Sequence, residues 1–138
     1  MDFTNLNFNN LQFTDLFTKK LKLIKITYKT SRNEIKLFNI KTPSLFLPFG
    51  IDKDKFKNYY LNLQLRNLNT DPNIKKFYNF FKNFESYLEK RFDKKIKSEL
   101  KINSKFEPII NCKIIQKYNK IITEVFNEKE NYNFFKIE

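Results

Sequence analysis

Hydrophobic and polar positions alternate most regularly over residues 60–66, in the sequence YLNLQLR. Leucine occupies every second position, and the side chains between the leucines belong to Tyr60, Asn62, Gln64 and Arg66. A period of two is typical of a β-strand that buries one face. The other face would present an aromatic ring, two amides and a guanidinium, which are groups that can stack on bases, bond base edges and contact phosphate.

A helical pattern follows this strand. Asp71 can cap the first free amides of a helix, and Pro72 suits the first helical position because its missing N–H costs nothing there. Apolar residues then recur at three- and four-residue steps: Ile74, Phe77, Tyr78, Phe81, Phe84, Leu88 and Phe92. The pattern predicts one amphipathic helix over about 72–92, with a structural role against a small sheet.

Shorter apolar stretches predict strands on both sides of this unit. Residues 19–29 and 35–40 are expected to form a hairpin, and 109–117 and 121–126 a second one. Residues 1–18 are rich in apolar positions that fit no single period, so we expect an arm that lies along the domain or packs on a neighbouring subunit. A strand or a helical turn is compatible with such an arm.

These elements define the expected fold class. Five or six short strands, with one long helix after the third, predict a mainly β protein and argue against a doubly wound parallel sheet. We expect a small antiparallel OB-like barrel over 19–138, with its helix inserted after the third strand. Phe46 and Phe49 are expected to pack the end of the barrel. Gly50, the chain's single glycine, is expected to take a backbone angle that other residues avoid.

Composition narrows the function classes. The formal charge is +12, which points to an anionic partner such as nucleic acid. The same excess of Lys, Asn, Ile, Phe and Tyr is what A+T-rich codons supply, so a coding bias is the competing explanation. The chain has no histidine and a single cysteine, which removes His-dependent triads and most zinc sites. Its carboxylates are scattered among lysines, so we expect no enzyme, no metal and no cofactor.

Targeting signals are absent from the sequence as given. No apolar run approaches the roughly 20 residues that a membrane-spanning helix needs. The first residues, MDFTNLNFNN, lack the basic and then apolar layout of a secretory signal. We therefore expect an intracellular protein that is neither secreted nor bound to a membrane.

Several short motifs occur in a recognisable order between residues 40 and 113. They are IKTP at 40–43, LPFGI at 47–51, the alternating strand, DP at 71–72 with its helix, and then Phe106, Pro108 and Lys113. This order resembles the single-stranded DNA-binding proteins of phages and of large nucleocytoplasmic DNA viruses. The resemblance implies an OB-fold that coats single-stranded DNA during replication, recombination or repair, at a viral replication site in the cytoplasm or nucleus of a host.

The resemblance also implies a homodimer or higher assembly, and an acidic C-terminal tail that competes with DNA and recruits replication proteins. This chain departs from that pattern, because Lys129 and Lys136 stand among the glutamates near its end. It is also short, as if the closing strands of the barrel were missing. We therefore expect a barrel that is reduced, open or completed by another chain.

Aromatic and basic side chains supply the candidate binding site. Rings stack on bases whatever the sequence, and lysine or arginine neutralises phosphate. The stacking candidates are Tyr28, Tyr60 and Tyr118. The phosphate-binding candidates are Lys22, Lys25, Lys29, Arg66, Lys113 and Lys117.

Each candidate has an ordinary structural alternative: a tyrosine in the core or at an interface, or a lysine that protects an edge strand. The sequence does not separate DNA from RNA. The competing function is a protein-interaction or structural module of an A+T-rich virus or organism, whose basic charge reflects codon usage. A continuous basic groove with exposed tyrosines would distinguish the nucleic-acid reading from this one.

Overall fold

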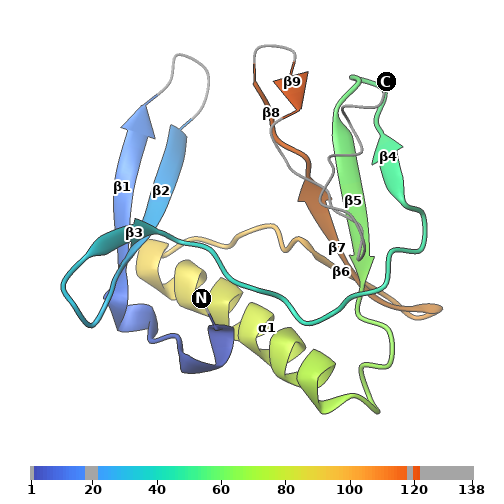
Figure 1. Cartoon of the computed structure of the whole chain (residues 1–138), viewed down its shortest axis with the longest axis horizontal. Helices are drawn as coiled ribbons and strands as arrows, with labels where there is room; N and C mark the ends of the chain where they lie inside the picture. The colour runs from blue at the N-terminus through green and yellow to red at the C-terminus, as the bar shows by residue number, and fades with distance from the viewer. Residues whose placement is uncertain (1, 18–21, 118–119, 122–138) are drawn as a thin grey trace. The chain divides into compact units, whose positions relative to one another are not determined.

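A computed structural model describes residues 2–17, 22–117 and 120–121 (Figure 1). The elements in chain order are η1 (Phe3–Asn5), η2 (Phe8–Asn10), β1 (Leu11–Phe17), β2 (Lys22–Lys29), β3 (Ile35–Leu37), β4 (Ile51–Lys53), β5 (Tyr59–Gln64), α1 (Pro72–Phe92), β6 (Leu100–Asn103), β7 (Phe106–Lys113), β8 (Gln116–Lys117) and β9 (Lys120–Ile121). The chain divides into a first unit, Met1–Ser44 with Asn69–Lys97, and a second unit, Leu45–Leu68 with Ser98–Glu138.

The first unit contains a three-stranded antiparallel sheet in the order β1-β2-β3. The predicted hairpin is confirmed, although its strands are shorter than expected, and residues 18–21 lie outside the described residues. Its turn closes where the N–H of Thr30 donates to the carbonyl of Glu34, with Asn33 at a φ of 61°. The segment predicted as an arm contains both helical turns, η1 and η2, and the strand β1.

The helix α1 confirms the predicted bounds. The carboxylate of Asp71 accepts a hydrogen bond from the N–H of Asn73 at 2.9 Å, which satisfies one of the free amides at the helix start. The helix ends at Asp93, which adopts a left-handed conformation with a φ of 49°. Ile74, Phe77 and Phe80 are its buried residues.

Aromatic rings form the core of the first unit. The ring of Phe3 lies 5.5 Å from that of Phe77 and 5.2 Å from that of Phe80. Further along the helix, the rings of Phe8 and Tyr87 are 5.1 Å apart. Pairs at these distances favour tilted or edge-on geometry, as observed here. The apolar stripe of α1 therefore has the structural role that its spacing predicts, and the N-terminal segment covers part of it.

The second unit contains a four-stranded antiparallel sheet in the order β4-β5-β7-β6, with a two-stranded ribbon of β8 and β9. The alternating strand is confirmed as β5, one of the two central strands, but its burial does not alternate as expected: Leu61 and Leu63 are only half-buried, and Gln64 is buried. The last leucine of the alternating pattern, Leu65, is fully buried, and Leu100, Ile110 and Ile114 are buried as well. The single strand predicted over 109–117 is instead two, β7 and β8, and most of its expected partner 121–126 lies outside the described residues.

The structure confirms a mainly β chain with one long helix, and it corrects the place of that helix in the order of strands. No closed barrel is present among the described residues, because the strands form separate sheets. The helix follows the fifth strand and not the third, because the expected arm contains β1 and because β4 is not among the expected strands. The expectation that these sheets represent a reduced OB-type arrangement stays a prediction. Among the described residues, no helix has the length and apolarity to cross a membrane.

The LPFG segment shows one confirmed prediction and one error. Gly50 has a φ of +65°, a region that side chains with a Cβ rarely adopt. Phe49 is 66% exposed and Phe46 is 39% exposed, so neither ring packs the end of a barrel as expected. Phe46 pairs with Gln64 through two backbone hydrogen bonds of 3.2 and 2.8 Å. The guanidinium carbon of Arg66 lies 3.3 Å from the centroid of the Phe46 ring.

Candidate nucleic-acid interface

Strand register builds one polar surface in the second unit. Side chains alternate between the two faces of a strand, so Tyr60, Asn62 and Gln64 of β5 share a face. Tyr60 is paired with Lys113 of β7 on one side and with Asp52 of β4 on the other. Asn62 is paired with Asn111 of β7. Gln64 is paired with Ile109 of β7, and Ile109 is paired with Lys101 of β6. We call this surface the polar face, and it consists of Asp52, Tyr60, Asn62, Gln64, Lys101, Ile109, Asn111 and Lys113.

Tyr60 lies between a carboxylate and an ammonium group. Its hydroxyl donates a hydrogen bond to Oδ2 of Asp52 at 3.2 Å, and Lys113 stands opposite it on β7. Desolvation raises the pKa of Tyr60, and the hydrogen bond to Asp52 adds to the effect. The phenol therefore stays neutral at physiological pH, and its ring is partly buried.

Two amides form the next row of the polar face. Nδ2 of Asn111 donates to Oδ1 of Asn62 at 2.9 Å. An asparagine amide has two N–H donors and two acceptor sites, so this pair leaves further donors and acceptors at the surface. Such groups suit the hydrogen-bonding edges of bases.

A depression of about 300 Å³ lies at one end of the polar face. It is lined by Asp54, Asn58, Tyr59, Tyr60, Asn111, Lys113 and Ile114. The carboxylate of Asp54 accepts hydrogen bonds from the N–H groups of Phe56 at 2.8 Å and of Asn58 at 2.9 Å, which fixes the turn between β4 and β5. The hydrogen bond from Asn58 is the main reason why the pKa of Asp54 lies below its ordinary value, and Lys113 contributes a smaller part.

The structure brings together only some of the predicted site residues. Tyr60 and Lys113 face each other across β5 and β7. Arg66 follows β5 in the same unit, but its guanidinium stacks on Phe46. Lys117 belongs to β8, where its side chain is not described, and Tyr118 lies outside the described residues.

The remaining candidates lie on β2 in the first unit, where Lys22 begins the strand. Tyr28 pairs with Leu11 of β1 and Lys36 of β3. Alternation along β2 places Lys25 and Lys29 on the face opposite Tyr28, so the strand does not combine this ring and these exposed lysines in one surface.

The sequence reasoning missed two neighbours of Tyr60. Asp52 lies in β4, which is not among the expected strands, and Asn111 lies in the expected strand 109–117 but is not among the candidate site residues. A local signal existed for the first, because Asp54 and Asn58 have the spacing of a side-chain-stabilised turn that sets the register of β4 against β5. The position of Asn111 depends on a pairing with Asn62, 49 residues away, and leaves no local signal.

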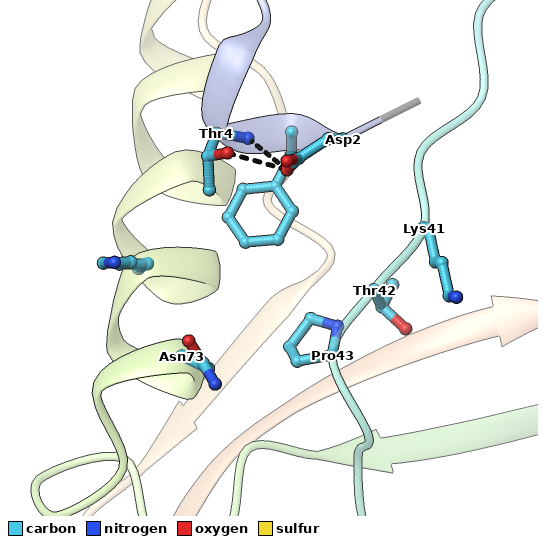
Figure 2. Close-up of a pocket in the computed structure, with 8 residues that line it drawn as sticks. Asp2, Thr4, Lys41, Thr42, Pro43 and Asn73 are labelled. Atoms are coloured by element: carbon cyan, nitrogen blue, oxygen red, sulfur yellow. Dashed lines mark hydrogen bonds between the residues drawn. The ribbon is translucent and has the colours of Figure 1, made fainter.

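Other surfaces are chemically less specific. A depression of about 520 Å³ in the first unit is lined by residues of the N-terminal segment, the 41–43 loop and the start of α1. Figure 2 shows the Asp2 carboxylate accepting hydrogen bonds there from the backbone N–H and the hydroxyl of Thr4, at 3.0 and 2.8 Å. Within the described residues, no group of three or more Cys, Asp or Glu side chains is placed to hold a metal ion.

Comparisons of the chain with protein-family models, curated proteins and solved structures found no match. The resemblance to viral and phage single-stranded DNA-binding proteins therefore rests on the short motifs alone and stays a prediction.

Proposed function

We propose that this chain is a non-catalytic protein that coats single-stranded nucleic acid, with the polar face of the second unit receiving the bases. The observation that carries the proposal is the register of β5 and β7, which sets the ring of Tyr60 opposite Lys113 and the amides of Asn62 and Asn111 beside them. A ring, a cation and amides on one sheet face are the groups that unpaired nucleotides require.

Each group has a separate physical task. A base stacked on an aromatic ring gains about 1–3 kcal/mol, without dependence on sequence. Lys113 and Lys101, both exposed, neutralise phosphates and release counterions, so the affinity falls as salt increases. Duplex DNA hides the faces of its bases, so the ring can act only on single strands. The motif resemblance supports DNA as the ligand, with replication, recombination or repair as the setting and a homodimer or higher assembly as the working form.

A protein-interaction module is the second candidate. In the second unit, Phe56 is 73% exposed and Phe106 is 61% exposed, and such aromatic residues are enriched at protein interfaces. On this alternative, the basic charge is a by-product of codon usage and the exposed rings bind a partner protein.

Fluorescence anisotropy with labelled oligo-dT and a matched duplex, each over a salt series, separates the candidates. We expect tight binding to oligo-dT, weak binding to the duplex and a clear salt dependence. Tyr60→Ala should weaken oligo-dT binding by about 5- to 150-fold, the equivalent of one stacked base, whereas Tyr60→Phe keeps the ring and most of the affinity.

Lysine variants supply a matched control within the same unit. Lys113→Gln should lower the slope of log K against log[salt] by about 0.7, the value for one phosphate contact on a single strand. Lys105→Gln removes the same charge from an exposed turn outside the polar face and should change the slope less. Equally weak binding to both oligonucleotides, lost near physiological salt, would overturn the proposal and favour the protein-interaction module.

A further inference from the structure

The position of Asp52 suggests that the polar face reads bases as well as stacking on them. This exposed carboxylate lies on β4 directly opposite Tyr60. Its Oδ2 accepts the hydroxyl of Tyr60 at 3.2 Å, and its Oδ1 accepts the N–H of Lys53 at 2.8 Å. Each oxygen of an ionised carboxylate has two acceptor sites, so one site on each oxygen remains. The ion pair of Lys36 with Glu34 does not involve Asp52.

A carboxylate beside the stacking ring does not fit a surface that contacts phosphate alone, because like charges repel. A carboxylate at this position can instead accept a hydrogen bond from an amino group. Aspartate and glutamate accept hydrogen bonds from the N4 amino group of cytosine, while thymine carries a carbonyl oxygen at the corresponding position. A thymine stacked on Tyr60 would therefore place its carbonyl oxygen against the carboxylate of Asp52, and two acceptors cannot form a hydrogen bond.

We infer that Asp52 selects bases that carry an exocyclic amino group, so that the protein prefers cytosine-containing single strands to thymine-containing ones. The inference rests on the proposed function, since it assumes that a base stacks on Tyr60. Tyr60 and Asp52 then act as one unit, in which their mutual hydrogen bond orients both the ring and the carboxylate.

The test compares oligo-dC and oligo-dT of equal length by fluorescence anisotropy at one salt concentration. We expect the full chain to bind oligo-dC at least about fivefold more tightly, the lower end of what one good base contact contributes. Asp52→Ala should bring the ratio of the two affinities close to one. Its loss of negative charge raises both affinities together, so the ratio isolates the base contact.

Two controls keep the test independent of protein folding and of net charge. Asp15→Ala removes an exposed carboxylate from β1 in the first unit and should leave the ratio unchanged. Oligo-dC with N4,N4-dimethylcytosine keeps the pyrimidine ring but has no amino N–H, so the unaltered protein should bind it like oligo-dT.

The outcomes separate the two proposals. Equal affinity of the unaltered protein for oligo-dC, its dimethylated form and oligo-dT would overturn the role of Asp52 and leave the coating function intact. No binding to any single strand would overturn the proposed function itself. A preference for oligo-dC that persists in Asp52→Ala would also contradict the inference, because another group would then be reading the base.

Discussion

Two isoleucines on neighbouring strands of the second unit test how the sheet that carries the polar face is stabilised. Ile110 of β7 is 5% exposed, and Ile102 of β6 is 68% exposed. Replacing either by alanine removes the same side-chain carbons, whose transfer from water contributes about 2.4 kcal/mol at full burial. At Ile110 the substitution loses almost all of this transfer free energy and also leaves a cavity, so the total loss of stability is about 3–4 kcal/mol. At Ile102 only about a third is lost, or ~0.8 kcal/mol.

The single cysteine of the chain provides the assay. Cys112 is half-buried on β7, on the same face as Ile110, and burial raises the pKa of its thiol. Its reaction with a thiol reagent during a brief pulse in increasing urea therefore reports the unfolding of this sheet. With a slope of about 1–3 kcal/mol per molar urea, Ile110→Ala should lower the midpoint by about 1 M or more.

Ile102→Ala is the matched control, and its midpoint should fall by less than a third as much. Equal shifts for the two variants would refute the reasoning, because Ile110 would then not be part of a core beneath the polar face. An unchanged midpoint in Ile110→Ala would refute it as well, since a cavity in a packed sheet has to cost free energy.

Two further predictions concern caps and turns. Asp71→Ala removes the hydrogen bond to the N–H of Asn73 and should lower the free energy of unfolding by about 1 kcal/mol. Thermal unfolding should then show a lower midpoint. An unaltered midpoint would show that the cap does not stabilise the helix. The pKa of Asp54 is lowered in the folded state, so its contribution to stability is complete above the ordinary value of 3.8 and is lost as the pH falls through the folded value. Asp54→Asn should therefore be less stable than the unaltered chain at neutral pH but not in strong acid, and a difference that stays constant across the acid titration would contradict this.

Local signals account for the parts of the fold that the sequence predicted. Asp71, Pro72 and the aromatic stripe lie within one helix, so each can be read without knowledge of the rest of the chain. The alternation of β5 is local in the same way. Strand β4 has three residues and owes its extended form to pairing with β5, so its sequence alone does not predict a strand.

The candidate site was predictable only where local patterns sufficed. Tyr60 was found because alternation placed its ring on the polar side of β5. Its neighbours Asp52 and Asn111 come from other strands, and their proximity follows from strand register, which residue types do not encode directly. The combination of Tyr28 with Lys25 and Lys29 could have been rejected from the sequence, because their spacing alone puts the ring and the lysines on opposite faces.

The interleaved course of the chain has a consequence for the order in which the protein folds. The hairpin of β2 and β3 closes across a few residues, whereas Asn62 meets Asn111 only after a loop of 49 residues has closed, and that loop includes the whole of α1. The entropy of loop closure makes such distant pairings late and slow. During synthesis the polar face cannot exist until Lys113 has left the ribosome, and no contiguous fragment that ends before β7 contains it. Neither unit is a continuous segment, so no single cut of the chain yields two fragments that each contain one whole unit.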